Sequence, residues 1–268
     1  MKRKYWYSDL DNTLNRKECG TEYLSTKVIS TIKKFRRLGG SFGVATTRGL
    51  LRTKEVIGNL SNLPLIVLNG AEVYDNDGVN QLSLPLHSDE LEAAIHSIKM
   101  YADDIDFCAF YKSKNVFGNV YTSTSTKAAQ IREKYPKTFQ NPKTDVTTSL
   151  LAFTRHIKAS SVAMIELQFK EGIKPQFPVC LQVSSDGIYY ITSKGVNKGF
   201  TLEIVSKLIG ISPLKLIISG DATTDATMMQ NEDVLSVGVG KTIEHVIQRV
   251  GSPEELATYI NGISIMQK

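Results

Sequence analysis

Apolar residues recur along the first third of the chain with two alternating periods. Short apolar runs at 5–10, 41–45 and 63–68 are typical of buried strands. Between them, residues 25–38 and 50–60 carry apolar side chains at helical spacing. The order strand, helix, strand, helix, strand predicts a parallel sheet with helical crossovers.

The pattern changes after about residue 84 and returns near residue 188. The segment in between mixes predicted helices and strands over about a hundred residues, which indicates an α+β unit. We therefore expect an α/β fold, a Rossmann-like doubly wound parallel-sheet core formed by residues 1–84 and 189–268. Residues 85–188 are expected to form an inserted α+β cap domain.

Composition narrows the classes of protein. With 41% hydrophobic and 22% charged residues the 268-residue chain is typical of globular proteins, and no apolar run is long enough to span a membrane. The basic start lacks the apolar segment of a signal peptide. Three widely spaced cysteines (Cys19, Cys108 and Cys180) predict no disulfide framework and favour a cytoplasmic setting. The net charge of +5 is dispersed, so it favours anionic small ligands and predicts no nucleic-acid partner.

Two pairs of acidic residues follow predicted strands. Asp9 and Asp11 come after the first strand, and Asp221 and Asp225 after a late one. Each pair alone is also typical of turns, since aspartate is common there. Together they fall at the carboxyl edge of the sheet, where open α/β folds bind their ligands. Carboxylates that meet there repel one another unless a cation neutralises them, and hard oxygen ligands suit Mg²⁺.

Four segments at predicted strand–helix junctions resemble, in order, the motifs of the haloacid dehalogenase superfamily of phosphotransferases. They are Ser8–Leu14 (pattern Asp-x-Asp-x-Thr), Val44–Arg48, Ser193–Gly199 and Ser219–Asp225 (pattern Gly-Asp-x-x-x-Asp). The position of the insert, together with Leu68–Glu72, resembles the class IIB or Cof-type members, which carry a large α+β cap.

The resemblance implies a mechanism of phosphoryl transfer. It makes Asp9 the nucleophile that forms an aspartyl-phosphate, and Asp11 the group that protonates the leaving oxygen and then activates water. Mg²⁺ is then expected on Asp9, the backbone carbonyl of Asp11 and Asp221, with support from Asp225. Two further residues are expected to bind the phosphoryl group, namely Thr46 and Lys198.

Other positions are weaker expectations. Four residues are weaker candidates for contact with the substrate, namely Thr47, Arg48, Asn69 and Thr224. Arg48 could instead contact the cap, and Thr47 and Thr224 are the positions where this sequence departs from the family pattern. At these last two positions relatives often carry Gly and Asn, respectively, so Thr224 replaces a carboxamide with a hydroxyl. Neither departure removes the nucleophile, the acid, a metal ligand or a phosphate contact.

The resulting hypothesis is a Mg²⁺-dependent phosphatase for a small phosphorylated metabolite, with a sugar phosphate as the favoured substrate. A cap over the site is expected to exclude polymers. Two alternatives stay open: a phosphomutase of the same fold, and a non-catalytic regulator that binds a sugar phosphate. The sequence leaves the oligomeric state undetermined.

Overall fold

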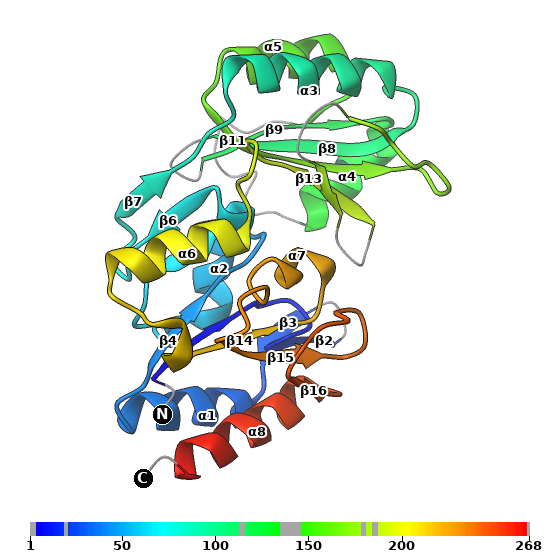
Figure 1. Ribbon diagram of the computed structural model, residues 1–268. Coiled ribbons are helices and arrows are strands. Elements are labelled where there is room, and N and C mark those ends of the chain that lie inside the picture. The colour runs from blue at the N-terminus through cyan, green and yellow to red at the C-terminus, as the bar shows by residue number, and fades with distance from the viewer. Residues whose placement is uncertain are drawn as a thin grey trace. The chain divides into compact units, whose positions relative to one another are not determined.

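The chain forms two compact units, described here from a computed structural model that covers residues 4–18, 21–112, 116–134, 146–177, 181–183 and 187–266. Unit 1 comprises Met1–Leu82 and Asn197–Lys268, and unit 2 comprises Ser83–Val196. Both ends of the chain therefore contribute to unit 1, whose ribbon is blue to cyan and yellow to red in Figure 1. Among the described residues, no helix has the length and apolar character needed to cross a membrane.

A five-stranded sheet lies at the centre of unit 1. Every neighbouring pair in it is parallel. In spatial order the strands are β16 (Gln248–Val250), β15 (Leu235–Val239), β14 (Leu216–Gly220), β1 (Tyr5–Ser8) and β4 (Ser41–Val44). The chain runs from β1 to β4 on one side and later fills the other side with β14 to β16, so the order reverses at β1. A ligand site is expected at such a reversal.

Helices cover both faces of this sheet. On one face α1 (Thr26–Arg37) and α8 (Pro253–Met266) lie side by side, and Asn261 donates a hydrogen bond to Thr31 at 2.7 Å (Figure 1). The other helices of unit 1 are α2 (Leu50–Ile57), α6 (Lys198–Leu208) and the short α7 (Thr223–Ala226). Leu202 and Val205 of α6 pack in one apolar cluster with Tyr7 and Ile218 of the sheet. The doubly wound α/β core is thus confirmed.

Two small antiparallel elements complete unit 1. The hairpin of β2 (Asn15–Glu18) and β3 (Thr21–Leu24) was not predicted. The other element is a three-stranded sheet of β5 (Leu65–Val67), β6 (Glu72–Tyr74) and β7 (Asn80–Ser83). A 3-10 turn (Leu68–Gly70) joins β5 to β6, and another (Pro213–Lys215) precedes β14.

Unit 2 contains a six-stranded mixed sheet. In spatial order its strands are β10 (Val146–Thr147), β9 (Val116–Thr122), β8 (Ile105–Lys112), β11 (Val162–Phe169), β13 (Ile188–Ile191) and β12 (Leu181–Val183). We expected Ile188–Ile191 to return to the core sheet, but β13 pairs antiparallel with β11. The compact units accordingly divide between residues 196 and 197, not at 188.

The helices of unit 2 cover the two faces of its sheet unequally. On one face, α3 (Ser88–Met100) and α5 (Leu150–Lys158) bury Ile95, Ile98, Phe153 and Ile157 against the sheet. On the other face lies α4 (Ser125–Lys134), whose Ala128 belongs to a smaller cluster. Cys108 is a buried free thiol, whereas Cys19 and Cys180 lie outside the described residues.

Candidate active site at the carboxyl edge of the parallel sheet

The ends of β1 and β14 bring the two acidic motifs together. Ser8 and Ser219 are paired in the parallel register, and the Asp9 N–H donates to the Ser219 carbonyl at 2.8 Å. Asp9 follows β1 directly and Asp221 follows β14 directly. The shared edge predicted for the two motifs is therefore present within one unit.

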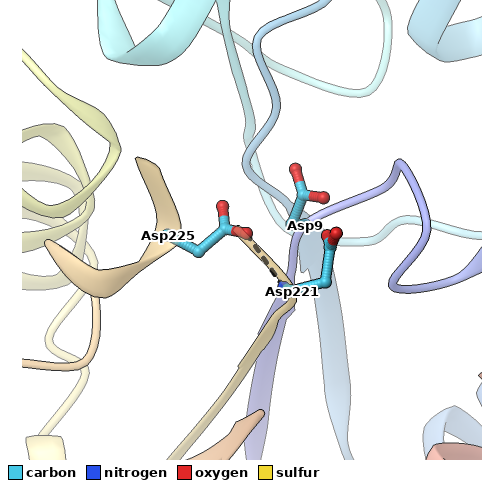
Figure 2. Close-up of side chains that lie close together, drawn as sticks. All are labelled: Asp9, Asp221 and Asp225. Atoms are coloured by element: carbon cyan, nitrogen blue, oxygen red, sulfur yellow. Dashed lines mark hydrogen bonds between the residues drawn. The ribbon is translucent and has the colours of Figure 1, made fainter. Parts of the chain in front are cut away.

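Three carboxylates form a compact group there. One oxygen from each of Asp9, Asp221 and Asp225 lies within 4.8 Å of the others. Figure 2 shows the three side chains gathered beyond the strand ends, with Asp225 reaching back to the backbone of Asp221. The Asp11 side chain is not a member of this group of three.

Asp225 is fixed by backbone contacts. Its Oδ2 accepts the N–H groups of Asp221 and Ala222, both at 3.0 Å. The side chain lies under Gly220, where an added Cβ would come within 2.4 Å of the Asp225 Cβ, so only glycine leaves room for it. Its other oxygen, Oδ1, accepts a hydrogen bond from Lys198 Nζ, so both oxygens of Asp225 are engaged. This suits a supporting role beside a metal better than direct ligation. Thr224 is buried next to it in α7, and its carbonyl accepts the Thr227 hydroxyl at 3.1 Å.

Lys198 provides the positive charge of the group. It is the first residue of α6, and Asn197 caps that helix by accepting the Phe200 N–H at 2.9 Å. The Lys198 Nζ donates at 2.6 Å to Asp9 Oδ1 and at 2.6 Å to Asp225 Oδ1. Burial alone would lower the pKa of Lys198, but the two carboxylates outweigh it and raise that pKa, so the ammonium stays charged.

The burial and proximity of the carboxylates raise the pKa values of Asp9 and Asp221. Burial, with repulsion from Asp225 and Asp221, raises the pKa of Asp9 well above its usual value despite the opposing effect of Lys198. Burial and Asp225 raise the pKa of Asp221 to about 6. Three carboxylates beside one ammonium leave a formal charge of −2. This donor set fits a small divalent cation that prefers oxygen ligands.

Thr13 also belongs to the site. It was not predicted as a site residue, although it occupies the last position of the first motif. Its hydroxyl donates to Asp221 Oδ1 at 2.8 Å and lies 3.4 Å from Asp9 Oδ2. The side chain is fully buried. It therefore links the two strand-end aspartates.

Asp11 is held by a different set of partners. Arg48 Nε donates to Asp11 Oδ2 at 2.7 Å, the Arg48 Nη2 binds the other oxygen, and Asn15 donates at 3.2 Å. The same guanidinium pairs with Glu22 of the β2–β3 hairpin at 2.5 Å. Burial would raise the pKa of Asp11, but the hydrogen bond and charge of Arg48 outweigh it and lower that pKa. Arg48, expected at the substrate, is thus buried in an ion-pair network with two carboxylates.

Thr46 and Asn69 lie on neighbouring loops. The Asn69 N–H donates to the Thr46 carbonyl at 3.0 Å, and the Thr46 hydroxyl accepts the Arg48 N–H at 3.2 Å. Thr46 is fully buried, and Thr47 is half-buried. Asn69 has a left-handed backbone with φ of 56°. Its buried amide lacks a hydrogen-bond partner within the described parts of the chain. A buried unsatisfied amide at a strained position is typical of functional loops.

Glu22 had no sequence signal, because its pairing with Arg48 joins two polar segments distant in the chain. Thr13 could have been found from the motif itself. The structure brings together Asp9, Lys198, Asp221 and Asp225, and separately Asp11 with Arg48.

Comparison with known proteins identifies the family. The sequence model of the haloacid dehalogenase-like hydrolases matches residues 6–251. The chain belongs to this family.

Named relatives and solved structures agree with this family. The HMP-PP phosphatase of Escherichia coli K12 is 25% identical over 238 residues, covering 87% of this chain and 80% of the relative. A candidate phosphatase of Buchnera aphidicola subsp. Schizaphis graminum is 29% identical over 234 residues, with 83% and 79% covered. A subclass IIB sugar phosphatase has the same fold, with a TM-score of 0.75 at 15% identity over 97% of this chain and 99% of that one. A Cof-like hydrolase from Plasmodium vivax has a TM-score of 0.75 at 17% identity, with 99% and 96% covered.

The family and the names of these relatives together support a phosphatase. The expected resemblance to Cof-type hydrolases is confirmed.

Proposed function

We propose that this phosphatase depends on Mg²⁺ and acts on a small phosphorylated metabolite, with a sugar phosphate as the favoured substrate. The observation that carries the proposal is the group of three carboxylates around the Lys198 ammonium at the sheet edge. Such a group is costly to bury without a ligand, because like charges repel in a low dielectric. A divalent cation and a phosphoryl group together would satisfy it.

Asp9, Asp221 and the backbone carbonyl of Asp11 would hold Mg²⁺, with Asp225 in support. When bound, the ion would neutralise phosphate charge so that an anionic nucleophile can approach. The Thr13 hydroxyl donates to Asp221 Oδ1 at 2.8 Å, so Oδ2 is the proposed metal ligand of that carboxylate.

Asp9 is the proposed nucleophile. One carboxylate oxygen forms a bond to phosphorus while the bond from phosphorus to the leaving oxygen breaks, which gives an aspartyl-phosphate. The Lys198 ammonium and the Thr46 hydroxyl would bind phosphoryl oxygens as charge accumulates on them. The hydroxyl of Thr46 accepts the Arg48 N–H, which leaves its own proton for such a bond.

Asp11 is proposed to protonate the leaving oxygen and then to take a proton from the attacking water. Arg48 lowers the pKa of Asp11, which favours the base role in the second step. The acid role in the first step requires the ion pair to loosen when substrate binds. Glu22 offers the guanidinium a second partner 2.5 Å away during such a change.

The substrate contacts are proposed at the loops around this group. Asn69 has an unsatisfied amide to offer, and Thr47 is half-buried on the neighbouring loop. Arg48 and Thr224 are retained as weaker proposals, because Arg48 is already paired and Thr224 is buried in α7. The likeness to a sugar phosphatase supports a sugar phosphate, and the HMP-PP phosphatase relative makes HMP-PP the next compound to test. We also propose a cytoplasmic setting, in which a free thiol such as that of Cys108 would stay reduced.

The test is phosphate release from a panel of sugar phosphates, nucleotides and HMP-PP, with Mg²⁺ and with EDTA, for the wild type and Asp9→Asn. We expect release that needs Mg²⁺ and falls by at least about 10⁴-fold in the variant. Equal release by Asp9→Asn would refute the nucleophile. Phosphate migration without release would indicate a mutase, and binding without turnover a regulator.

A further inference from the structure

Unit 2 contains a cavity that the chemistry above does not use. It has a volume of about 300 Å³ and lies among β8, α4, β11 and β13. That volume is at the lower end of the range for small-molecule sites. Its apolar lining comes from Phe107, Ile131 and Ile188.

The polar lining combines donors and acceptors. Asp106, Glu166, Lys127, Gln130 and Gln168 supply two carboxylates, one ammonium and two carboxamides. The ammonium of Lys127 is already paired with Asp106. The formal charge of the lining is therefore −1, with its one cation committed.

This composition selects the class of ligand. A phosphate or carboxylate would meet net negative charge and an ammonium that already has a partner. Hydroxyl groups, in contrast, both donate and accept, so they match carboxylates and carboxamides at once. The ring of Phe107 and the two aliphatic side chains offer an apolar surface to carbon–hydrogen groups.

Glu166 is oriented in advance of any ligand. It accepts the Tyr111 hydroxyl at 3.1 Å, across the neighbouring strand β8. A carboxylate held in place in this way loses less entropy when a ligand binds.

We propose that this cavity binds an uncharged, hydroxyl-rich molecule, namely a sugar or polyol. The choice of sugars as probes rests on the proposed function, whereas the cavity and its charge do not.

The test uses the full-length Asp9→Asn variant, so that binding is read without turnover. Glucose, trehalose and mannitol are titrated by calorimetry and by saturation-transfer NMR. We expect millimolar or tighter binding of at least one of them, and a loss of about tenfold when Gln130→Ala and Gln168→Ala are added. Glu133→Ala, an exposed change on the same helix that does not line the cavity, is the matched control and should leave binding unchanged.

Three outcomes overturn the proposal. One is no binding of any neutral sugar. Another is binding that the Gln130→Ala, Gln168→Ala pair does not weaken, which would place the ligand elsewhere. The third is preferential binding of inorganic phosphate that Lys127→Met abolishes, which would make the cavity an anion site. None of these bears on catalysis by Asp9, which the phosphate-release assay tests separately.

A second, independent observation concerns a buried chain of hydrogen bonds that ends at Asp9. The indole N–H of Trp6, the chain's only tryptophan, donates to Ser219 Oγ at 2.9 Å. The Ser219 hydroxyl donates to Ser8 Oγ at 2.7 Å, and the Ser8 hydroxyl donates to the Asp9 carbonyl at 2.7 Å. All four residues are buried.

The direction of this chain is fixed, because the indole N–H can only donate and the Asp9 carbonyl can only accept. Each hydroxyl accepts from one neighbour and donates to the next, an arrangement that strengthens every bond in it. The chain crosses between β1 and β14, the two strands that deliver Asp9 and Asp221. We infer that Trp6, Ser219 and Ser8 are positioning residues that hold the Asp9 peptide in place.

The test is Ser219→Ala, with Ser236→Ala as the matched control. Ser236 is another buried serine, on the adjacent strand β15, and its hydroxyl accepts the Ile247 N–H at 3.0 Å. We expect Ser219→Ala to lower kcat by about tenfold with little change in KM, and to reduce the change in tryptophan fluorescence that beryllofluoride causes on binding Asp9. Ser236→Ala should lower stability alone. If Ser219→Ala also changes stability alone, with kcat and the fluorescence response intact, the positioning role is refuted.

Discussion

The two units of this protein bury their polar groups differently. Among the described residues, the buried ionisable side chains with a formal charge are all in unit 1, and they are Asp9, Arg48, Glu72, Lys198 and Asp225. The buried polar residues of unit 2 are serines and threonines (Ser97, Thr122, Thr154, Thr192 and Ser193). Its main cluster otherwise consists of aliphatic and aromatic side chains from α3, α5 and the sheet.

This difference indicates that unit 1 holds the reactive groups and that unit 2 contributes mainly apolar packing. Burying a charge costs free energy unless the charge is paired. A cluster of buried charges therefore indicates a functional site. In unit 1 three of them, Asp9, Lys198 and Asp225, meet at the sheet edge, in a group that a metal and a phosphoryl group would complete. Unit 2 is stabilised by apolar packing. The predictions below test that division.

The largest effect is expected for Lys198→Met. Loss of the ammonium leaves Asp9 and Asp225 buried without their shared partner, so the free energy of unfolding should fall by about 3–5 kcal/mol, together with loss of activity. Urea unfolding in the absence of divalent metal measures the change in the free energy of unfolding. Lys207→Met removes an exposed ammonium from the same helix and should cost less than about 0.5 kcal/mol. Similar costs for both variants would contradict the claim that the buried charges of unit 1 depend on their pairing.

Phe153→Ala tests the apolar core of unit 2. Phe153 is fully buried, and its ring centroid lies 5.7 Å from that of Phe110 and 6.0 Å from that of Tyr121. The cavity should cost about 3–4 kcal/mol, read by calorimetry. The Mg²⁺ affinity that we propose for unit 1 should stay unchanged. Leu151→Ala, an exposed change on the same helix, is the control. A Phe153→Ala variant that loses metal binding while still folded would show that the two units are coupled.

Thr13→Val tests a hydrogen bond at the sheet edge. The change keeps the shape but removes the donor to Asp221 Oδ1 at 2.8 Å. We expect the free energy of unfolding to fall by about 1.5–3 kcal/mol, because a hydrogen bond to a carboxylate contributes more stability than one between neutral groups. We also expect a shift in the Mg²⁺ titration midpoint. Thr258→Val, on the exposed side of α8, should shift neither quantity. An unchanged Mg²⁺ midpoint in Thr13→Val would remove Thr13 from the site.

Glu90→Gln is expected to have the smallest effect. Burial would raise the pKa of Glu90, but the N–H groups of His87 and Lys194 and the Ser193 hydroxyl outweigh it and lower that pKa. A lowered pKa in the folded state contributes stability above the unfolded pKa near 4.5 and loses it as the pH falls further. The Tm of Glu90→Gln should therefore lie below that of the wild type at pH 7 by less than about 3 °C. At pH 3.5 the difference should narrow. A gap that widens in acid would contradict the sign of the pKa shift.

The sequence predicted the parallel core well, because each element there has a strong local signal. Ser25, for example, caps α1 as its side chain accepts the Val28 N–H. The β2–β3 hairpin was missed because its polar sequence lacks apolar alternation. The helix α5 was also missed, although Leu150, Phe153 and Ile157 repeat at helical spacing. Strand β13 was recognised but assigned to the wrong sheet, since a strand's own pattern does not name its partner.

The site shows the same limit. Motif order was enough to predict that Asp9, Lys198 and the late aspartates lie together. The pairing of Arg48 with Asp11 and Glu22 was not predicted, because it depends on where a hairpin folds back. The local sequence pattern predicts which residues lie at the sheet edge. Tertiary contacts, such as those of Arg48, decide which of these residues are already paired.

The most direct test of the central claim is to trap the phosphorylated enzyme. Asp11→Asn is mixed with 4-nitrophenyl phosphate and Mg²⁺, quenched in acid and analysed by peptide mass spectrometry. This substrate has a leaving group that needs no proton, so attack by Asp9 should proceed while hydrolysis, for which Asp11 is the proposed base, is slowed. We predict a phosphoryl group on the peptide that contains Asp9, absent when Asp9→Asn is added. Release of 4-nitrophenol with no phosphorylated peptide at any time would contradict the account.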